Sequence, residues 1–179
     1  MDAKKLYFAS LLLFIIVAIA YGPIPQPQSY HDFADDRKFL NIPNALDVMS
    51  NLVIIFPGLV GLAFVHERRK DPLVSDDETS IHITIFAGMI LTFAGSVWFH
   101  LDPNDSTMFW DRLGMSIVIG ASISLMINDF WDKELAGRIH IPIIIASMIS
   151  VLCWPVFDDL RVYFIVKHHP FILFPIFLV

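Results

Sequence analysis

Ser96, His100 and Asp111 stand where two apolar runs meet, in the stretch G-S-V-W-F-H-L-D-P-N-D-S-T-M-F-W-D-R-L-G-M. Ser96 and His100 are four residues apart, so on a helix their side chains share one face. Asp111 lies near the start of the next apolar run, and the short loop between the runs returns it to the same end. Ionisable side chains beside hydrocarbon are costly, so these three residues are candidates for a functional site.

The three side chains suit metal-assisted hydrolysis. The imidazole of His100 could be one ligand of a catalytic zinc, which normally takes three protein ligands and a water. Ser96 could donate a hydrogen bond to a developing oxyanion, and Asp111 could accept a proton from the attacking water or orient it. The alternative is a polar cluster in which Asp111 caps the second helix and His100 bonds to it. Nucleophilic serine catalysis is disfavoured because the chain has no G-x-S-x-G.

The composition indicates a polytopic membrane protein. Of 179 residues, 56% are hydrophobic and only 17% are charged, and the mean hydropathy is +0.64. We therefore expect an all-α transmembrane helix bundle, with five to six spans at about 6–21, 44–65, 81–100, 108–127, 139–156 and 162–179, the second kinked at Pro57. The single cysteine, Cys153, excludes a disulfide framework. The net charge of -6, without a basic stripe, argues against a nucleic-acid partner.

The chain divides into three parts. Residues 1–21 are either an N-terminal anchor or a cleaved signal, residues 22–43 are an acidic loop opened by prolines, and residues 44–179 form the bundle. With the amino terminus inside, seven Lys and Arg residues lie in inner segments and four in outer ones. The inner ones are Lys4, Lys5, Arg68, Arg69, Lys70, Lys133 and Arg138, and the outer ones are Arg37, Lys38, Arg112 and Arg161. The candidate site therefore faces the periplasm or a lumen.

Two further groups could bind metals. Asp32 and Asp35 in the acidic loop supply the oxygen ligands that calcium prefers, although acidic loops are usually only solvated. His168 and His169 lie in the last apolar run, at the same outer depth as the candidate site, and either could serve as a zinc ligand. Adjacent helical residues point about 100 degrees apart, so the two histidines cannot easily share one ion.

Several motifs resemble one family. The S-x-x-x-H of G-S-V-W-F-H, with an aspartate eleven residues after the histidine in W-D-R-L, resembles the signature of the alkaline ceramidases and their bacterial relatives. Their superfamily of membrane hydrolases also includes the adiponectin and progestin receptors. Y-H-D-F-A-D-D-R, I-P-N-A-L-D-V-M-S-N-L and D-D-L-R-V-Y-F-I-V-K-H-H-P are similar to further segments of the family, in the same order. The resemblance covers nearly all of the chain from about Tyr30.

The resemblance implies a bundle of seven core helices around a zinc ion that three histidines hold. One of these corresponds to His100, and two come from an H-x-x-x-H on the last helix. It also implies that Ser96 stabilises the oxyanion, that Asp111 acts on the zinc-bound water, and that calcium binds at Asp32 and Asp35. The implied reaction is hydrolysis of the amide of ceramide or a similar membrane lipid, which releases a fatty acid and a sphingoid base.

The chain departs from the family in one respect. It contains no H-x-x-x-H and stops at about the fifth core helix, so we expect a truncated member whose zinc site is incomplete and which is inactive alone. A C-terminal segment or a second chain would then supply the other ligands. The alternative is a non-enzymatic membrane protein, a lipid-binding, receptor-like or degenerate relative.

Overall fold

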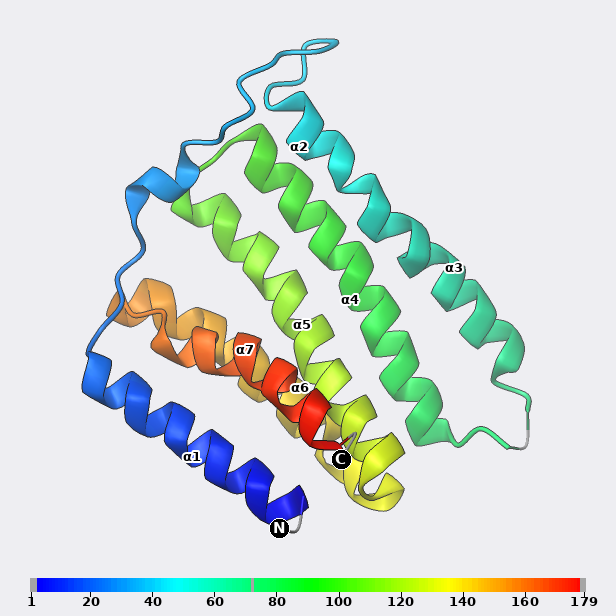
Figure 1. The fold of residues 1–179 in the computed structure, drawn as a ribbon. Coiled ribbons are helices and arrows are strands. Elements are labelled where there is room, and N and C mark those ends of the chain that lie inside the picture. The colour runs from blue at the N-terminus through cyan, green and yellow to red at the C-terminus, as the bar shows by residue number, and fades with distance from the viewer. Residues whose placement is uncertain (1–2, 72, 178–179) are drawn as a thin grey trace.

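The structure, a computed structural model, describes residues 3–71 and 73–177, which are mostly helical (Figure 1). Within these ranges an isolated bridge between Phe39 and Ile42 is the sole β pairing. The all-α helical bundle expected from the sequence is therefore confirmed. Its helices are α1 (Ala3–Tyr21), the 3-10 helix η1 (Gln28–His31), α2 (Ala45–Ser50), α3 (Leu52–Arg68), α4 (Asp76–Leu101), α5 (Asp105–Phe130), α6 (Lys133–Phe157) and α7 (Arg161–Phe177).

Four helical segments are long and apolar enough to cross a membrane, which marks the chain as a membrane protein. They are Ala45–Arg68, which joins α2 and α3, and the helices α4, α5 and α6. α4, α5 and α6 contain the apolar runs predicted at 81–100, 108–127 and 139–156, and Ala45–Arg68 contains all but the first residue of the run predicted at 44–65. α4 and α6 begin before those runs because capped polar turns extend them. The side chain of Ser75 accepts from the backbone N of Glu78 at 3.1 Å, and that of Asp132 from Leu135 N at 2.9 Å.

The second span divides at Asn51, where α2 meets α3. α3 continues as a helix through Pro57. The kink at Pro57 stays a prediction. The side chains of Ser50 and Asn51 both donate to the carbonyl of Asp47, at 2.7 and 3.0 Å. Such bonds to the preceding turn compete with the regular backbone ladder.

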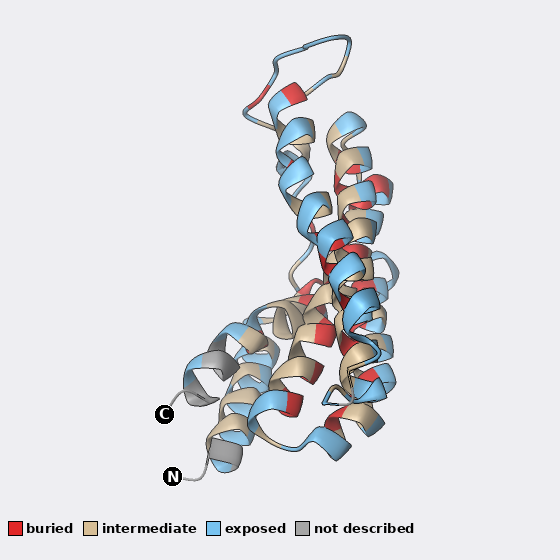
Figure 2. Cartoon of the chain, turned by 90° about the vertical axis from the view of Figure 1, so that its right-hand side faces the viewer, coloured by how far each residue is buried: buried red, intermediate tan, exposed pale blue. Residues whose placement is uncertain are grey.

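The helices form an open arrangement in two parts. α3, α4 and α5 lie side by side in one layer (Figure 1), and α1, α6 and α7 diverge to one side of it in the view turned by 90° (Figure 2). α1 packs along α7. Glycines let α4 and α5 approach closely, since a Cβ on Gly95 would lie 2.5 Å from the carbonyl oxygen of Trp110. A Cβ on Gly114 would lie 2.5 Å from Thr92 N. The α4–α5 contact is thus backbone against backbone.

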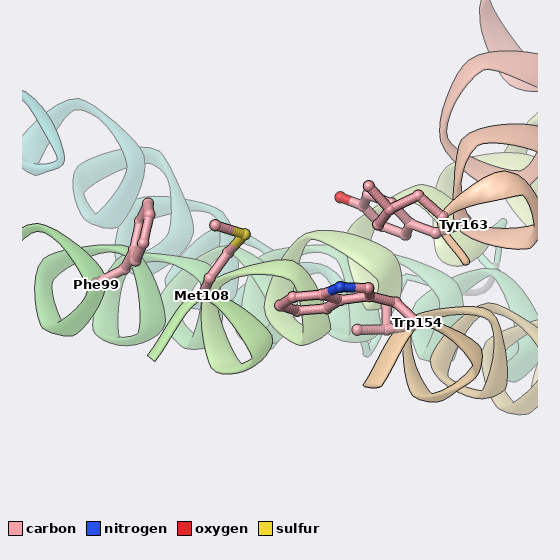
Figure 3. Packing of buried hydrophobic residues seen from close by; sticks show 6 residues of the cluster. Phe99, Met108, Trp154 and Tyr163 are labelled. Atoms are coloured by element: carbon pink, nitrogen blue, oxygen red, sulfur yellow. The ribbon is translucent and has the colours of Figure 1, made fainter. Parts of the chain in front are cut away.

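The segments assigned to the outer side gather at one end of the bundle. The side chain of Asn44 donates to the carbonyl of His100 at 2.8 Å, and the backbone N of Leu160 donates to the carbonyl of Ile24 at 2.8 Å. An apolar core underlies this end and draws side chains from α4, α5, α6 and α7 (Figure 3). Its buried members are Phe99, Met108, Val151, Trp154, Leu160 and Tyr163.

Candidate functional site

Ser96 and Asp111 come together where α4 and α5 touch. Ser96 is 7% exposed, and its side chain interacts with the carboxyl group of Asp111. The neighbouring Gly95 permits this approach, because a Cβ there would lie 2.7 Å from the backbone N of Asp111. The structure therefore brings together two of the three residues predicted to form the site, one on each helix.

Asp111 does not cap α5. The N-cap is Asn104, whose side chain accepts from the backbone N of Ser106 at 2.9 Å and of Thr107 at 3.1 Å. The hydroxyl of Thr107 accepts in return from the backbone N of Asn104, which completes a capping box, and α5 begins at Asp105. Asp111 thus lies well inside the helix, and the alternative in which it acts as a helix cap is wrong.

His100 lies in the last turn of α4, one turn beyond Ser96. Its Nδ1 is buried and has no hydrogen-bond partner among the described residues. The carboxylate of Asp47 lies 4.0 Å from this nitrogen, and the ring centroid of Phe33 lies 4.7 Å from that of His100. His100 and Asp111 are near enough to interact electrostatically. The spacing of the sequence does not connect Asp47 with His100.

Among the described residues, the candidate site supplies fewer ligands than a catalytic zinc normally takes. The unpartnered Nδ1 of His100 is a suitable ligand atom, and the Asp111 carboxyl lies in the same cluster. A catalytic zinc normally has three protein ligands. The described part of the chain holds no group of three or more His, Cys, Asp or Glu side chains that could bind a metal.

The two residues predicted to bind calcium differ in their surroundings. Asp32 is exposed, whereas Asp35 is buried. Arg37 forms an ion pair with Asp35, and the backbone N of Leu46 donates to Asp35 at 2.9 Å. The hydrogen bond from Arg37, helped by the one from Leu46, holds the pKa of Asp35 below its usual range. In this arrangement Asp35 ties the acidic loop to the start of α2.

The paired histidines of α7 have separate surroundings. His168 is exposed and its ring nitrogen hydrogen-bonds within its own helix. His169 is buried, and its ring centroid lies 5.0 Å from that of Tyr7, which in turn contacts Trp131 at the C-cap of α5. These contacts direct His169 toward the end of α5 remote from His100, not toward the outer depth that the sequence suggested.

Arg112 is a functional candidate that the sequence reasoning missed. The charge count places Arg112 in an outer segment, but it lies inside α5 and is only 6% exposed. Its guanidinium carbon lies 4.5 Å from the ring centroid of Trp154, and its Nη2 donates to Gln26 at 2.6 Å. One signal was available, since the span predicted from Met108 contained Arg112, and a charge within a span indicates a functional role.

No protein-family model matches the chain, and neither the curated proteins nor the solved structures gave a match. The chemistry of the site therefore follows from its own geometry. That geometry combines a hydroxyl donor, a carboxylate that can accept a proton and an imidazole nitrogen that can bind a metal, all at the end of the α4–α5 pair.

Proposed function

We propose that this chain is part of an alkaline ceramidase-like membrane hydrolase and carries Ser96, His100 and Asp111 of its active site. The observation that supports this most directly is the contact of Ser96 with Asp111 across α4 and α5, one helical turn from an unpartnered nitrogen of His100. Amide hydrolysis needs a base, a donor for the oxyanion and, in this family, a metal ligand. The position between apolar helices favours a lipid substrate such as ceramide.

In this proposal, water attacks the carbonyl carbon of the lipid amide and the C–N bond breaks, which gives a fatty acid and an amine. When bound, zinc would polarise the carbonyl and acidify the water. Asp111 accepts the proton of the attacking water and delivers it to the leaving nitrogen. Ser96 donates a hydrogen bond to the oxyanion. The Nδ1 of His100 would be one of the ligands that hold the metal. The remaining ligands would come from an H-x-x-x-H helix that these residues do not include.

The proposal also assigns the site to the outer side of the membrane. We propose a multi-pass chain whose amino terminus is inside and whose 22–43 loop is outside. The excess of Lys and Arg in the inner segments supports this orientation. The meeting of the loop with the ends of α4 and α7 at one end of the bundle also supports it.

The test joins the chain to a helical segment of an alkaline ceramidase that carries H-x-x-x-H, and it measures zinc content and fatty acid released from ceramide. We expect stoichiometric zinc in the joined protein and loss of zinc in His100→Ala. Asp111→Asn should retain zinc but lower kcat by about 10²–10⁴-fold, and Ser96→Ala by about 10²–10³-fold. His82→Ala, at the other end of α4, is the control and should change neither quantity. A joined protein without zinc, or equal zinc in His100→Ala, would contradict the proposal.

A second candidate is lipid binding without catalysis. One observation favours it, because the described residues contain no group of three metal ligands. In that case His100→Ala and Asp111→Asn would leave lipid binding unchanged, and the joined protein would release no fatty acid.

A further inference from the structure

The guanidinium of Arg112 is buried without a carboxylate partner. No ion pair within the described residues involves Arg112. Asp111 and Asp105 affect it only through longer-range electrostatics. Its Nη2 donates to Gln26, but its Nη1 is buried with no hydrogen-bond partner. A buried charge that lacks a counter-ion is costly to keep, so the arrangement suits a site for an incoming anion.

The hydroxyl of Tyr163 is a second unpartnered group at the same place. Tyr163 is 1% exposed, its Oη has no hydrogen-bond partner, and its ring centroid lies 5.4 Å from the guanidinium carbon of Arg112. The hydroxyl extends from α7 over the indole of Trp154 (Figure 3). An anionic oxygen bound here would accept from both groups, and hydrogen bonds between charged partners are among the strongest in proteins.

The surroundings of this pair favour an anion over a cation. The ammonium of Lys167 lies 5.8 Å from the ring centroid of Tyr163 and adds a second positive charge. The nearby carboxylate of Asp105 is already engaged by His31, at 3.0 Å. On the side of the 22–43 loop, the ring of Tyr30 covers Arg112 at 5.7 Å and is itself 56% exposed. Movement of Tyr30 would therefore open the site.

A cavity of about 640 Å³ adjoins Arg112 through Trp154, whose ring the guanidinium contacts. Its wall combines apolar side chains, among them Phe109, Trp110 and Leu152, with the polar side chains of Asp105, Ser106 and Asp158. Pockets of this size hold small ligands. Arg112 follows Asp111 directly, and adjacent helical residues point about 100 degrees apart. The two side chains can therefore contact different parts of one lipid.

We propose that Arg112 and Tyr163 bind the anionic group, a carboxylate or a phosphate, of a lipid amide. The site then prefers an acidic lipid amide over a neutral one such as ceramide. The lipid-amide part of this inference rests on the proposed function, whereas recognition of the anion rests on Arg112 and Tyr163 alone.

The experiment compares matched lipids by calorimetric titration of the full chain in detergent micelles. N-oleoylglycine and N-oleoylethanolamine share the oleoyl amide and differ in a terminal carboxylate against a hydroxymethyl group. Ceramide 1-phosphate and ceramide form the corresponding phosphate pair. We expect the acidic member of one pair to bind about tenfold more tightly than its neutral partner, and that pair identifies the anion. Equal affinity within both pairs would overturn the inference.

Variants separate binding from folding. Tyr163→Phe removes a hydroxyl that has no partner, so it should not lower the melting temperature, yet it should weaken binding of the acidic lipid about fivefold. Arg112→Gln should remove the preference for the acidic lipid. Arg138→Gln, which changes an exposed arginine of α6, is the control and should keep the preference. Unchanged affinity for the acidic lipid in Tyr163→Phe would overturn the inference.

The two proposals fail in different ways, because these titrations need no turnover. A joined protein without hydrolase activity would leave the preference for an acidic lipid intact. If the joined protein hydrolyses ceramide but substitution of Arg112 and Tyr163 leaves lipid affinity unchanged, the proposed function stands and this inference is wrong.

Discussion

Asp159 fastens the loop after α1 to the start of α7. Its carboxylate accepts from the backbone N of Ile24 at 3.2 Å and pairs with the guanidinium of Arg161 at 2.7 Å. The hydrogen bonds from the Arg161 side chain, followed by those from backbone N–H groups, lower the pKa of Asp159 to about 2. One short side chain thus connects segments that are far apart in the sequence.

This low pKa predicts a pH-dependent contribution to stability. The folded pKa of Asp159 lies below the unfolded value of about 3.9, so its contribution is complete above that value and disappears as the pH falls toward 2. Asp159→Asn should lower the melting temperature near neutral pH by about 1–4 °C, since such pairs contribute modestly. The difference from the wild type should vanish on acidification, measured by thermal unfolding in detergent. The control is Asp158→Asn, which should change little, and a deficit that persists in acid would refute the prediction.

Individual site residues were predictable where a single helix sets the geometry. Ser96 and His100 share a face because four residues separate them, and the structure keeps them on one helix. The partners contributed by other helices were harder to predict. The position of Asp47 near His100 depends on how α2 packs against α4. The contact of Arg112 with the ring of Tyr163 depends on the packing of α7. Sequence spacing carries no information about such contacts between helices.

At the scale of elements, the glycines of α4 and α5 set the distance between the two halves of the candidate site. Gly95→Ala would place a Cβ 2.5 Å from the carbonyl oxygen of Trp110, which is backbone and cannot rotate away. We expect the helices to separate, at a cost of about 1–3 kcal/mol of folding free energy. Unfolding in denaturant would measure this cost. Gly58→Ala is the milder comparison, since its Cβ would lie 3.1 Å from the Ile90 side chain and 3.2 Å from the carbonyl oxygen of Phe86, both looser than the contact at Gly95. Equal stability of Gly95→Ala and wild type would argue against the close contact.

Hydropathy predicted the apolar middle of each long helix but not where the helix begins and ends. The apolar runs located α4, α5 and α6, but the helices continue into polar turns that hydropathy ignores. Local signals did mark those ends, because Ser75, Asn104 and Asp132 are all N-cap residues. The sequence marks the division at Asn51 less clearly than a proline would, because the division arises from side chains that bond to the preceding turn.

At the scale of the whole molecule, the sequence predicted an all-α bundle but not the neighbours of each helix. The apolar helices are hydrophobic on nearly every side, so no face of α1 indicates that it packs on α7. The order of neighbours from α3 to α6 follows the chain, as short connections require. The placement of α7 against α1 and α5 comes from tertiary packing alone.

The proposed orientation can be tested with single cysteines. The segment Ala45–Arg68 has 24 residues and, at about 1.5 Å per residue, is longer than the roughly 30 Å hydrocarbon layer. Residues at its two ends should therefore lie on opposite sides of the membrane. In a Cys153→Ser background, Asp36→Cys should react with an impermeant maleimide on intact cells, whereas Lys70→Cys should react only after the membrane is opened. The reverse pattern would invert the orientation and place Ser96 and His100 inside, and labelling of both positions from outside would show that this segment does not cross.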